Sequence, residues 1–276
     1  MSSEAKGTAQ ITGTALITGA SSGIGALYAD RLARRGHDLI LVARNRQRLD
    51  ALAERLRAET GRRVETLAAD LNEPADLARV EAVLRTDRRI TTLVNNAGVG
   101  GAAPLLDSDV EAMDRMIRLN VLALTRLTYA TAPAFVERGR GTFINIASIV
   151  AISPETLNGV YGGTKAFVLA FSQSLQHELS SKGIRVQAVL PGATATEFWD
   201  IAGVPVAQLP QAIVMSAEDM VDAALAGLDD GEFVTIPSLP DIAQWDAYEG
   251  ARQAMRSNLS RTTPAARYTR SSTAAA

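Results

Sequence analysis

The fold is decided by the stretch TALITGASSGIG at residues 14–25. Its first five residues are apolar or β-branched and predict a buried strand, and the residues from Gly23 onward repeat with helical periodicity. Glycines in the turn between them let the backbone approach a pyrophosphate, and the free N–H groups at the start of the helix attract that anion. The stretch therefore predicts a phosphate-binding turn, although a purely structural tight turn would give the same pattern.

The rest of the chain alternates short apolar runs with longer amphipathic ones. Strands are predicted at residues 14–18, 37–43, 64–68, 91–95, 142–147, 184–190 and, on a weaker pattern, 233–236. Helices are predicted at residues 23–35, 46–59, 74–85, 109–137, 159–181 and 218–228. Pro133 is expected to kink or end the helix at 109–137. Continuous apolar runs separated by helices indicate an α/β fold, a doubly wound Rossmann-like parallel sheet of about seven strands flanked by helices in a single domain.

Composition excludes several classes of site and partner. The 276 residues include no cysteine, which excludes disulfides, cysteine-bound zinc, iron–sulfur clusters and a thiolate nucleophile, and the two histidines argue against a multi-histidine metal site. A net charge of −2 does not suit a nucleic-acid-binding protein. The polar N-terminus lacks a secretory signal, and no run of about 18 apolar residues predicts a membrane span. We expect a cytoplasmic protein without metal, nucleic-acid or membrane partners.

One motif in the first turn points to a different chemistry. Residues 19–23 fit the G-x-S-x-G pattern around the nucleophile of α/β-hydrolases. That fold needs several strands before the serine, and an acidic residue and then a histidine after it. Here the motif follows the first strand, and His37 and His177 lie in or beside ordinary secondary structure. The hydrolase alternative is therefore disfavoured.

The end of the second predicted strand bears on the choice of nucleotide. In dinucleotide-binding folds an acidic residue there binds the ribose 2′-hydroxyl, whereas an arginine can pair with a 2′-phosphate. Ala43 occupies the expected acidic position and Arg44 stands beside it, so NADP(H) is favoured over NAD(H). A plain surface role for Arg44 stays open, and Arg46 and Arg48 either assist or are simply solvated.

Residues 18–25 resemble the cofactor signature of the short-chain dehydrogenases/reductases, and the resemblance covers about residues 12–240. It implies cofactor contacts in four places. The expected contacts are Gly19, Ser21, Ser22, Gly23, Ile24 and Gly25 in the first turn, Asp70 and Leu71 after the third strand, Asn96, Ala97 and Gly98 after the fourth, and Pro191, Gly192, Thr194 and Thr196 after the sixth. Asp70 would meet the adenine, unless it only caps a turn. Thr196, or else Thr194, would meet the nicotinamide carboxamide.

Four residues reproduce the Asn-Ser-Tyr-Lys tetrad of that family. Tyr161 and Lys165 lie four positions apart on a predicted helix and therefore share a face. Ser148 stands thirteen positions before Tyr161, and Asn120 lies within the long predicted helix. Between the tyrosine and the lysine the family often has Ser-Ala-Ser, whereas this chain has Gly-Gly-Thr at 162–164, which leaves the tetrad positions intact.

The resemblance implies a role for each member of the tetrad. Hydride transfer to a carbonyl builds an alkoxide that must gain a proton, and Tyr161 would be the acid, or the base in the reverse direction. A nearby Lys165 ammonium should lower the phenol pKa from its usual value of about 10. Lys165 would also bond the nicotinamide ribose and Ser148 would donate to the carbonyl oxygen. Asn120 would hold a water that relays protons.

The chain is expected to have three parts: a flexible N-terminus at 1–12, an NAD(P)-binding domain at 13–250 and a basic, flexible tail at 251–276. Residues 197–215 are irregular and apolar, and the resemblance implies a lid at about 193–215 over an uncharged or hydrophobic carbonyl or alcohol substrate. A subunit interface is the alternative use of this segment. The resemblance also implies a homodimer or homotetramer formed through the helices at 109–137 and 159–181.

The sequence as a whole predicts an NADP(H)-dependent oxidoreductase that moves a hydride between nicotinamide and a carbonyl or alcohol, with reduction as the expected direction. A sugar-nucleotide epimerase or dehydratase of the related extended family would share the tyrosine and the lysine. It normally needs a larger C-terminal substrate region than the roughly 35 residues after 240. A non-catalytic NADP(H)-binding redox sensor is the other alternative, and the complete tetrad disfavours it.

Overall fold

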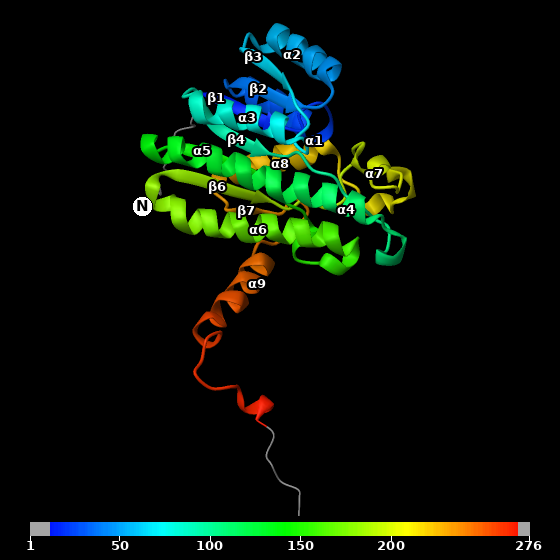
Figure 1. The fold of residues 1–276 in the computed structure, drawn as a ribbon, viewed down its shortest axis with the longest axis vertical. Coiled ribbons are helices and arrows are strands. Elements are labelled where there is room, and N and C mark those ends of the chain that lie inside the picture. The colour runs from blue at the N-terminus through cyan, green and yellow to red at the C-terminus, as the bar shows by residue number, and fades with distance from the viewer. Residues whose placement is uncertain (1–11, 270–276) are drawn as a thin grey trace, which may run out of the picture. The chain divides into compact units, whose positions relative to one another are not determined.

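The computed structural model describes residues 12–269, which contain one seven-stranded parallel sheet in the order β3-β2-β1-β4-β5-β6-β7 (Figure 1). The strands are β1 Thr14–Thr18, β2 Asp38–Ala43, β3 Val64–Ala68, β4 Ile90–Asn95, β5 Gly141–Ile146, β6 Ile184–Val189 and β7 Val234–Thr235. Every predicted strand is present, and the doubly wound α/β fold is confirmed. Apart from residue 12, the expected N-terminal segment lies outside the described residues, as do residues 270–276 of the expected tail.

Helices connect and cover the strands. They are α1 Gly23–Arg34, α2 Arg46–Thr60, α3 Pro74–Thr86, α4 Val110–Ile117, α5 Leu124–Arg138, α6 Gly159–Leu179, α7 Phe198–Ile201, α8 Ala217–Asp230 and α9 Ala243–Ala254. The chain divides after Ser238 into two compact units, with the sheet and α1–α8 in the first and α9 in the second. Within residues 12–269 no helix has the length and apolar character needed to cross a membrane.

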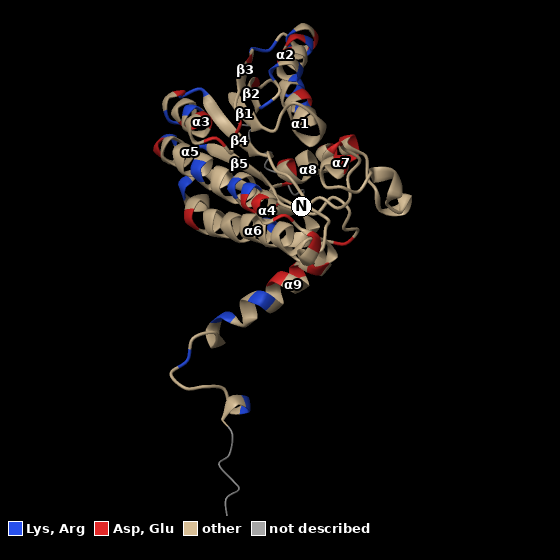
Figure 2. Cartoon of the chain, turned by 45° about the vertical axis from the view of Figure 1, so that its right-hand side comes forward, with Lys and Arg blue, Asp and Glu red and all other residues tan. Residues whose placement is uncertain are grey.

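The second unit begins at Leu239, whereas the expected NAD(P)-binding domain extends to residue 250, which lies inside α9. α9 carries Asp246 in its first turn and Arg252 in its last, an order of charges that suits the helix dipole (Figure 2). Arg252 also pairs with Glu249 at 2.6 Å. The arginines that follow α9 in this unit belong to the segment expected to be basic.

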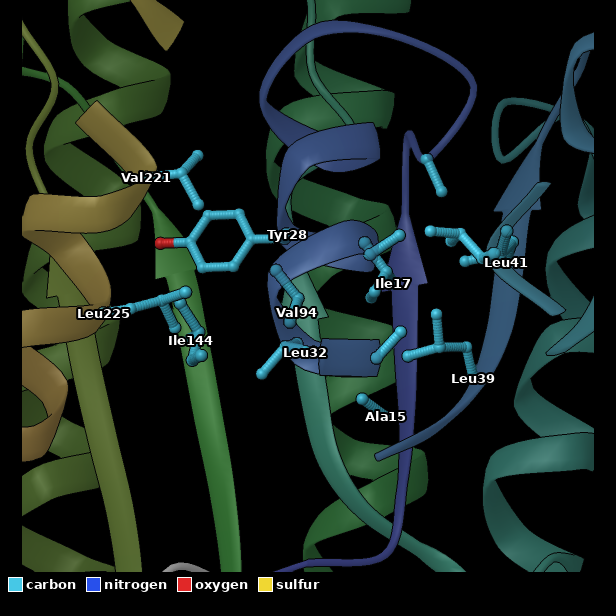
Figure 3. Packing of buried hydrophobic residues seen from close by; sticks show 14 of the residues in the cluster. Ala15, Ile17, Tyr28, Leu32, Leu39, Leu41, Val94, Ile144, Val221 and Leu225 are labelled. Atoms are coloured by element: carbon cyan, nitrogen blue, oxygen red, sulfur yellow. The ribbon is translucent and has the colours of Figure 1, made fainter. Parts of the chain in front are cut away.

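Apolar side chains fill both faces of the sheet. Ala15 and Ile17 of β1 pack in a cluster with residues of α1, α2 and α8, whereas Leu16 between them packs with residues of α3, α5 and α6. Figure 3 shows the first cluster, in which Tyr28 of α1 reaches toward Val221 of α8. Burial on both faces explains why the strands read as continuous apolar runs in the sequence.

The long helix expected at 109–137 is interrupted, but not at its proline. α4 is followed by a π-helical segment at Arg118–Ala123, and α5 then continues through Pro133. Of the two effects expected of Pro133, a kink or an end, the end is wrong, because α5 runs on to Arg138. Pro133 lies on the exposed side of α5, where water can satisfy the carbonyl that loses its N–H partner, while the buried ring of Phe135 holds the next turn against the sheet.

Candidate active site

The candidate site lies at the carboxyl edge of the sheet, where the strand order reverses between β1 and β4. Doubly wound folds bind nucleotides at this position because the loops there diverge. A cavity of about 880 Å³ opens at this edge. The predicted site residues that line it are Gly19, Ser22, Gly23, Ile24, Asn96, Ala97, Gly98, Ser148, Tyr161, Lys165, Pro191, Gly192, Thr194 and Thr196.

Two glycines shape the turn between β1 and α1. Gly19 has a φ of 66°, in the left-handed region that favours glycine. A Cβ on Gly25 would lie 2.3 Å from the carbonyl oxygen of Gly19, so no side chain fits at that position. Ser22 precedes α1 without a side-chain capping bond, which leaves the first N–H groups of the helix for another partner. The turn therefore fits an anion such as a pyrophosphate.

Hydrogen bonds hold the end of β4 against this turn. The side-chain amide of Asn96 donates to the carbonyl oxygen of Thr18 at 2.9 Å. The Thr18 hydroxyl accepts the backbone N–H groups of Asn96 and Ala97, both at 3.0 Å. The sequence did not reveal that Thr18 ties the two loops together. A hydroxyl residue at the end of the strand, directly before the first glycine, was the available signal.

Three members of the predicted tetrad meet in the cavity. α6 presents Tyr161 and Lys165 from successive turns, and Ser148 follows β5. The two α6 side chains are buried, and the Lys165 Nζ lies 5.8 Å from the centre of the Tyr161 ring. Lys165 donates a hydrogen bond to the carbonyl oxygen of Ile146 at 2.8 Å. The Ser148 hydroxyl donates to the carbonyl oxygen of Pro191 at 3.4 Å and accepts the N–H of Val150 at 3.3 Å.

Burial governs the protonation of this cluster. It raises the pKa of Tyr161 to about 12, and the Ser148 hydroxyl only partly opposes that rise. Burial also lowers the pKa of Lys165 to about 8. The net shift is opposite to the lower pKa expected for the tyrosine, because the buried phenolate loses its hydration. At neutral pH the phenol keeps its proton.

Asn120 lies in the π-helical segment and outside the lining of the cavity. Its amide nitrogen donates to the carbonyl oxygen of Val99 at 2.8 Å and to the hydroxyl of Thr164 at 3.1 Å. Its amide oxygen accepts the N–H of Val99 at 3.0 Å. The side chain thus holds the loop after β4 against α6. Thr164, which in the sequence was only a departure from the family pattern, is a supporting residue of the site.

The residues expected around the adenosine also lie outside the lining of this cavity. Arg44 is exposed directly after β2, and no described residue forms an ion pair with it. Arg48, by contrast, pairs with Glu197 at 2.7 Å. Asp70 accepts the N–H of Asn72 at 2.9 Å, the turn role that the sequence left open. The other predicted contacts that do not line the cavity are Ser21, Gly25 and Leu71.

The segment between β6 and α8 is tied down at its base. The N–H of Met215 donates to the carbonyl oxygen of Ala193, and its carbonyl accepts the N–H of Ala195, each at 2.9 Å. The Trp199 indole is buried and donates to the carbonyl oxygen of Thr194 at 2.9 Å. These bonds fix where the segment leaves the sheet and where it returns.

The same segment gives the cavity an apolar wall. Its lining side chains include Phe198, Trp199, Ile201, Leu209, Ile213 and Met215. Two charged side chains line the cavity among the described residues, Lys165 and Glu197. Acidic residues mark α7 itself (Figure 2), with Glu197 directly before it and Asp200 in its first turn. Within residues 12–269, no group of three or more histidine, aspartate or glutamate side chains could hold a metal ion.

Comparisons with known proteins place this geometry in context. The sequence matches the short chain dehydrogenase family over residues 13–202. A short-chain dehydrogenase from Sphingobium yanoikuyae, solved in complex with NADPH, is 55% identical, with a TM-score of 0.91 over 93% of this chain and 100% of that one. The bulky-bulky ketone specific alcohol dehydrogenase from Comamonas testosteroni is 47% identical, with a TM-score of 0.86 over 93% and 98%. The very-long-chain 3-oxoacyl-CoA reductase of Anas platyrhynchos is 36% identical over 193 residues, which are 68% of this chain but span only 62% of that relative.

Proposed function

Because the chain belongs to the short-chain dehydrogenase/reductase family, whose members act on alcohol and carbonyl groups, we propose that it reduces the carbonyl of an uncharged, largely apolar substrate with NADPH. The observation that carries this proposal is the meeting of Tyr161, Lys165 and Ser148 in a mostly apolar cavity beside a turn that fits a pyrophosphate. NADPH supplies the hydride when it is bound. The residues of the chain bind it, hold the carbonyl and provide the proton.

One end of the cavity suits the pyrophosphate of NADPH, and the other suits its nicotinamide. The turn at Gly19 and Gly23 and the open N-terminus of α1 would receive the pyrophosphate, since N–H groups and the helix dipole stabilise negative charge there. Thr196 lines the cavity on the β6 side, and its oxygen accepts the N–H of Phe198 at 3.4 Å. Its own hydroxyl proton remains for the nicotinamide carboxamide. Lys165 would bond the nicotinamide ribose.

The preference for NADPH is proposed from the charges after β2. Arg44 follows Ala43, so this position offers a guanidinium and no carboxylate to the adenosine ribose. Arg48 is already paired with Glu197, which leaves Arg44 as the better candidate for a 2′-phosphate. The Sphingobium yanoikuyae relative was solved with NADPH, which supports the same choice.

Tyr161 is the proposed proton donor. Its phenol is protonated at neutral pH because burial raises its pKa to about 12. Ser148, which lines the same cavity, would donate to the same substrate oxygen as negative charge develops there. The Lys165 ammonium would stabilise the phenolate that remains after the proton has left. A donor that keeps its proton until the alkoxide forms favours reduction over oxidation.

Proton return and substrate class follow from the surroundings of the cluster. Asn120 holds Val99 and Thr164 together, and we propose that a water relay carries protons from Lys165 to solvent past this side chain. The apolar lining favours an uncharged ketone or aldehyde. Among the described residues, Lys165 is the only cation in the lining that could pair with a carboxylate or phosphate on a substrate. The Comamonas testosteroni relative is specific for bulky-bulky ketones, which supports an apolar substrate.

We also propose that the chain assembles as a homodimer or homotetramer through α5 and α6. Tyr129 of α5 is 70% exposed and stacks on Phe171 of α6, with ring centres 6.4 Å apart. Phe167 stacks on the same Phe171 at 5.6 Å. Exposed apolar clusters of this kind mark interaction surfaces, and aromatic residues are enriched in the centres of interfaces.

Fluorescence titration with NADPH and, in parallel, NADH tests the cofactor assignment. We expect NADPH to bind more tightly, and Arg44→Ala to weaken NADPH by about 2 kcal/mol, or about thirtyfold, without affecting NADH, because a charged hydrogen bond to phosphate is lost. Arg48→Ala is the matched control and should change NADPH affinity little, since its partner is Glu197. Equal weakening by both substitutions, or tighter binding of NADH, would contradict the role of Arg44.

Tyr161→Phe tests the chemistry. The variant should bind NADPH with unchanged affinity and lose ketone-dependent oxidation of NADPH, because the ring remains and only the donated proton is removed. Unchanged turnover in this variant would rule out Tyr161 as the donor. A wild-type protein that binds NADPH but oxidises it with no carbonyl in a broad screen would point instead to a non-catalytic sensor.

A further inference from the structure

We propose that Phe198 is a specificity-determining residue, which sets the size of the ketone substituent accepted beside Tyr161, and that Gly100 leaves the space that its ring needs. This inference rests on the proposed function and narrows the substrate class. The preferred ketones should carry a compact substituent on the Phe198 side of the carbonyl and a larger group against the rest of the apolar wall.

The first observation is the close approach of Phe198 to the loop after β4. A Cβ built on Gly100 would lie 2.2 Å from Cζ and 2.8 Å from Cε2 of the Phe198 ring. Gly100 is not among the glycines with positive φ, so its backbone conformation is open to other residues. The missing side chain at position 100 is therefore explained by the ring and not by the backbone.

The second observation is the position of the same ring relative to the proton donor. The ring centres of Phe198 and Tyr161 are 5.7 Å apart, their planes are inclined at 46°, and both side chains line the cavity. The ring also packs in a small cluster that contains Val99 and Val150. A carbonyl that accepts a hydrogen bond from Tyr161 must consequently place one of its substituents next to the phenyl ring.

The third observation is the anchoring of Phe198 through its neighbour. The Trp199 ring stands at 89° to the Phe198 ring, with centres 5.6 Å apart. Trp199 is buried and donates to the carbonyl oxygen of Thr194, which pairs with Met215 at the base of the segment. The phenyl ring is therefore attached to the rigid base of the segment, and it forms a wall that a substrate has to fit.

The substrate-size test uses phenyl ketones with methyl, ethyl and isopropyl as the second substituent, reduced with NADPH. Phe198→Ala should raise the kcat/KM ratio of the isopropyl to the methyl ketone by about tenfold or more, since one misfitting methylene typically changes selectivity by about 10- to 200-fold. Most of the change should appear in KM, with NADPH affinity retained. Phe198→Leu keeps apolar packing and should give a smaller change in the same direction. It replaces the alanine variant in this test if that variant does not fold.

A double substitution tests the contact itself. Gly100→Ala should displace the ring toward Tyr161 and lower kcat/KM for every ketone by about tenfold or more in the wild-type background. In the Phe198→Ala background it should have almost no effect, because the clashing atoms are gone. Gly163→Ala is the control for a glycine replacement, since a Cβ there would meet nothing within 4 Å, and it should leave the size ratio unchanged in both backgrounds.

Each outcome separates this inference from the proposed function. A size ratio that stays the same in Phe198→Ala and Phe198→Leu, while the enzyme still reduces ketones, overturns the role of Phe198 alone. An equal effect of Gly100→Ala in both backgrounds overturns the proposed contact. A wild-type protein that reduces none of the ketones contradicts the proposed function, and this inference fails with it.

Discussion

Replacing Lys165 by methionine should make the protein more stable at neutral pH. Lys165 is buried, and burial lowers its pKa from the ordinary 10.5 to about 8. A difference of about 2.5 pKa units corresponds to about 3 kcal/mol of unfavourable free energy for holding the ammonium in the folded protein at neutral pH. Methionine keeps a long apolar side chain and removes the buried charge. Because the Ile146 carbonyl loses its hydrogen bond from Lys165, which costs about 1–3 kcal/mol, the expected gain in the free energy of unfolding is about 1 kcal/mol near pH 7.

The pH dependence of this effect follows from where each state releases the proton. The folded protein releases it near pH 8 and the unfolded chain near pH 10.5, so between these values the unfolded chain binds more protons and the free energy of unfolding rises with pH. Tyr161 acts in the opposite sense above pH 10, because the unfolded chain loses the phenol proton near pH 10 and the folded protein only near pH 12. The Lys165 contribution is thus visible from pH 8 to pH 10.

Urea unfolding of the wild type and Lys165→Met, near pH 7 and near pH 10, measures this difference. The methionine variant should be more stable near pH 7, and this advantage should be lost near pH 10, where the wild-type amine is neutral in the folded state. Lys165→Arg is the matched control, because it keeps a charge across the whole range and should show no gain. A methionine variant that is less stable near pH 7, or a difference that does not change with pH, would refute the reasoning.

Two further substitutions test the core and the proposed assembly. Tyr28→Phe should raise the free energy of unfolding by about 1 kcal/mol in urea titrations, because the buried hydroxyl has no partner among the described residues and an unsatisfied polar group costs about 1–3 kcal/mol; a loss of stability would show that the hydroxyl is satisfied. Tyr129→Lys combined with Phe171→Lys should reduce the mass measured by sedimentation to that of a monomer while NADPH binding is retained, because charges would replace the stacked rings. An unchanged oligomer would exclude this face as the interface.

The strands and the first turn could be predicted because their signals are local. Five consecutive residues make β1, and the glycines directly after it are required where Gly19 adopts a left-handed conformation and Gly25 leaves no space for a Cβ. Tyr161, Lys165 and Ser148 were singled out by the resemblance to the short-chain dehydrogenases/reductases, and the structure brings the three to the same edge of the sheet, on α6 and directly after β5.

Features that depend on burial or on distant contacts could not be predicted. Pro133 is tolerated because it faces solvent, and the sequence did not show which side of α5 is exposed. Arg48 and Glu197 form their ion pair across 149 positions, so the sequence could not separate Arg48 from Arg44 as a phosphate ligand. The direction of the Tyr161 pKa depends on how completely β5, α6 and the segment before α8 surround the phenol, and spacing in the sequence carries no information on that.

The same burial links proton donation, stability and substrate choice. Exclusion of water raises the pKa of Tyr161, so the phenol keeps its proton until an alkoxide forms. The same exclusion makes the buried Lys165 ammonium unfavourable and lowers the stability of the folded protein. Phe198 contributes to that exclusion, since its ring lies against the phenol and lines the same cavity. A ring that limits the substituent of the ketone therefore also limits the water that reaches the donor. Widening the cavity for larger substrates should for this reason bring the pKa of Tyr161 closer to its ordinary value and weaken its hold on the proton.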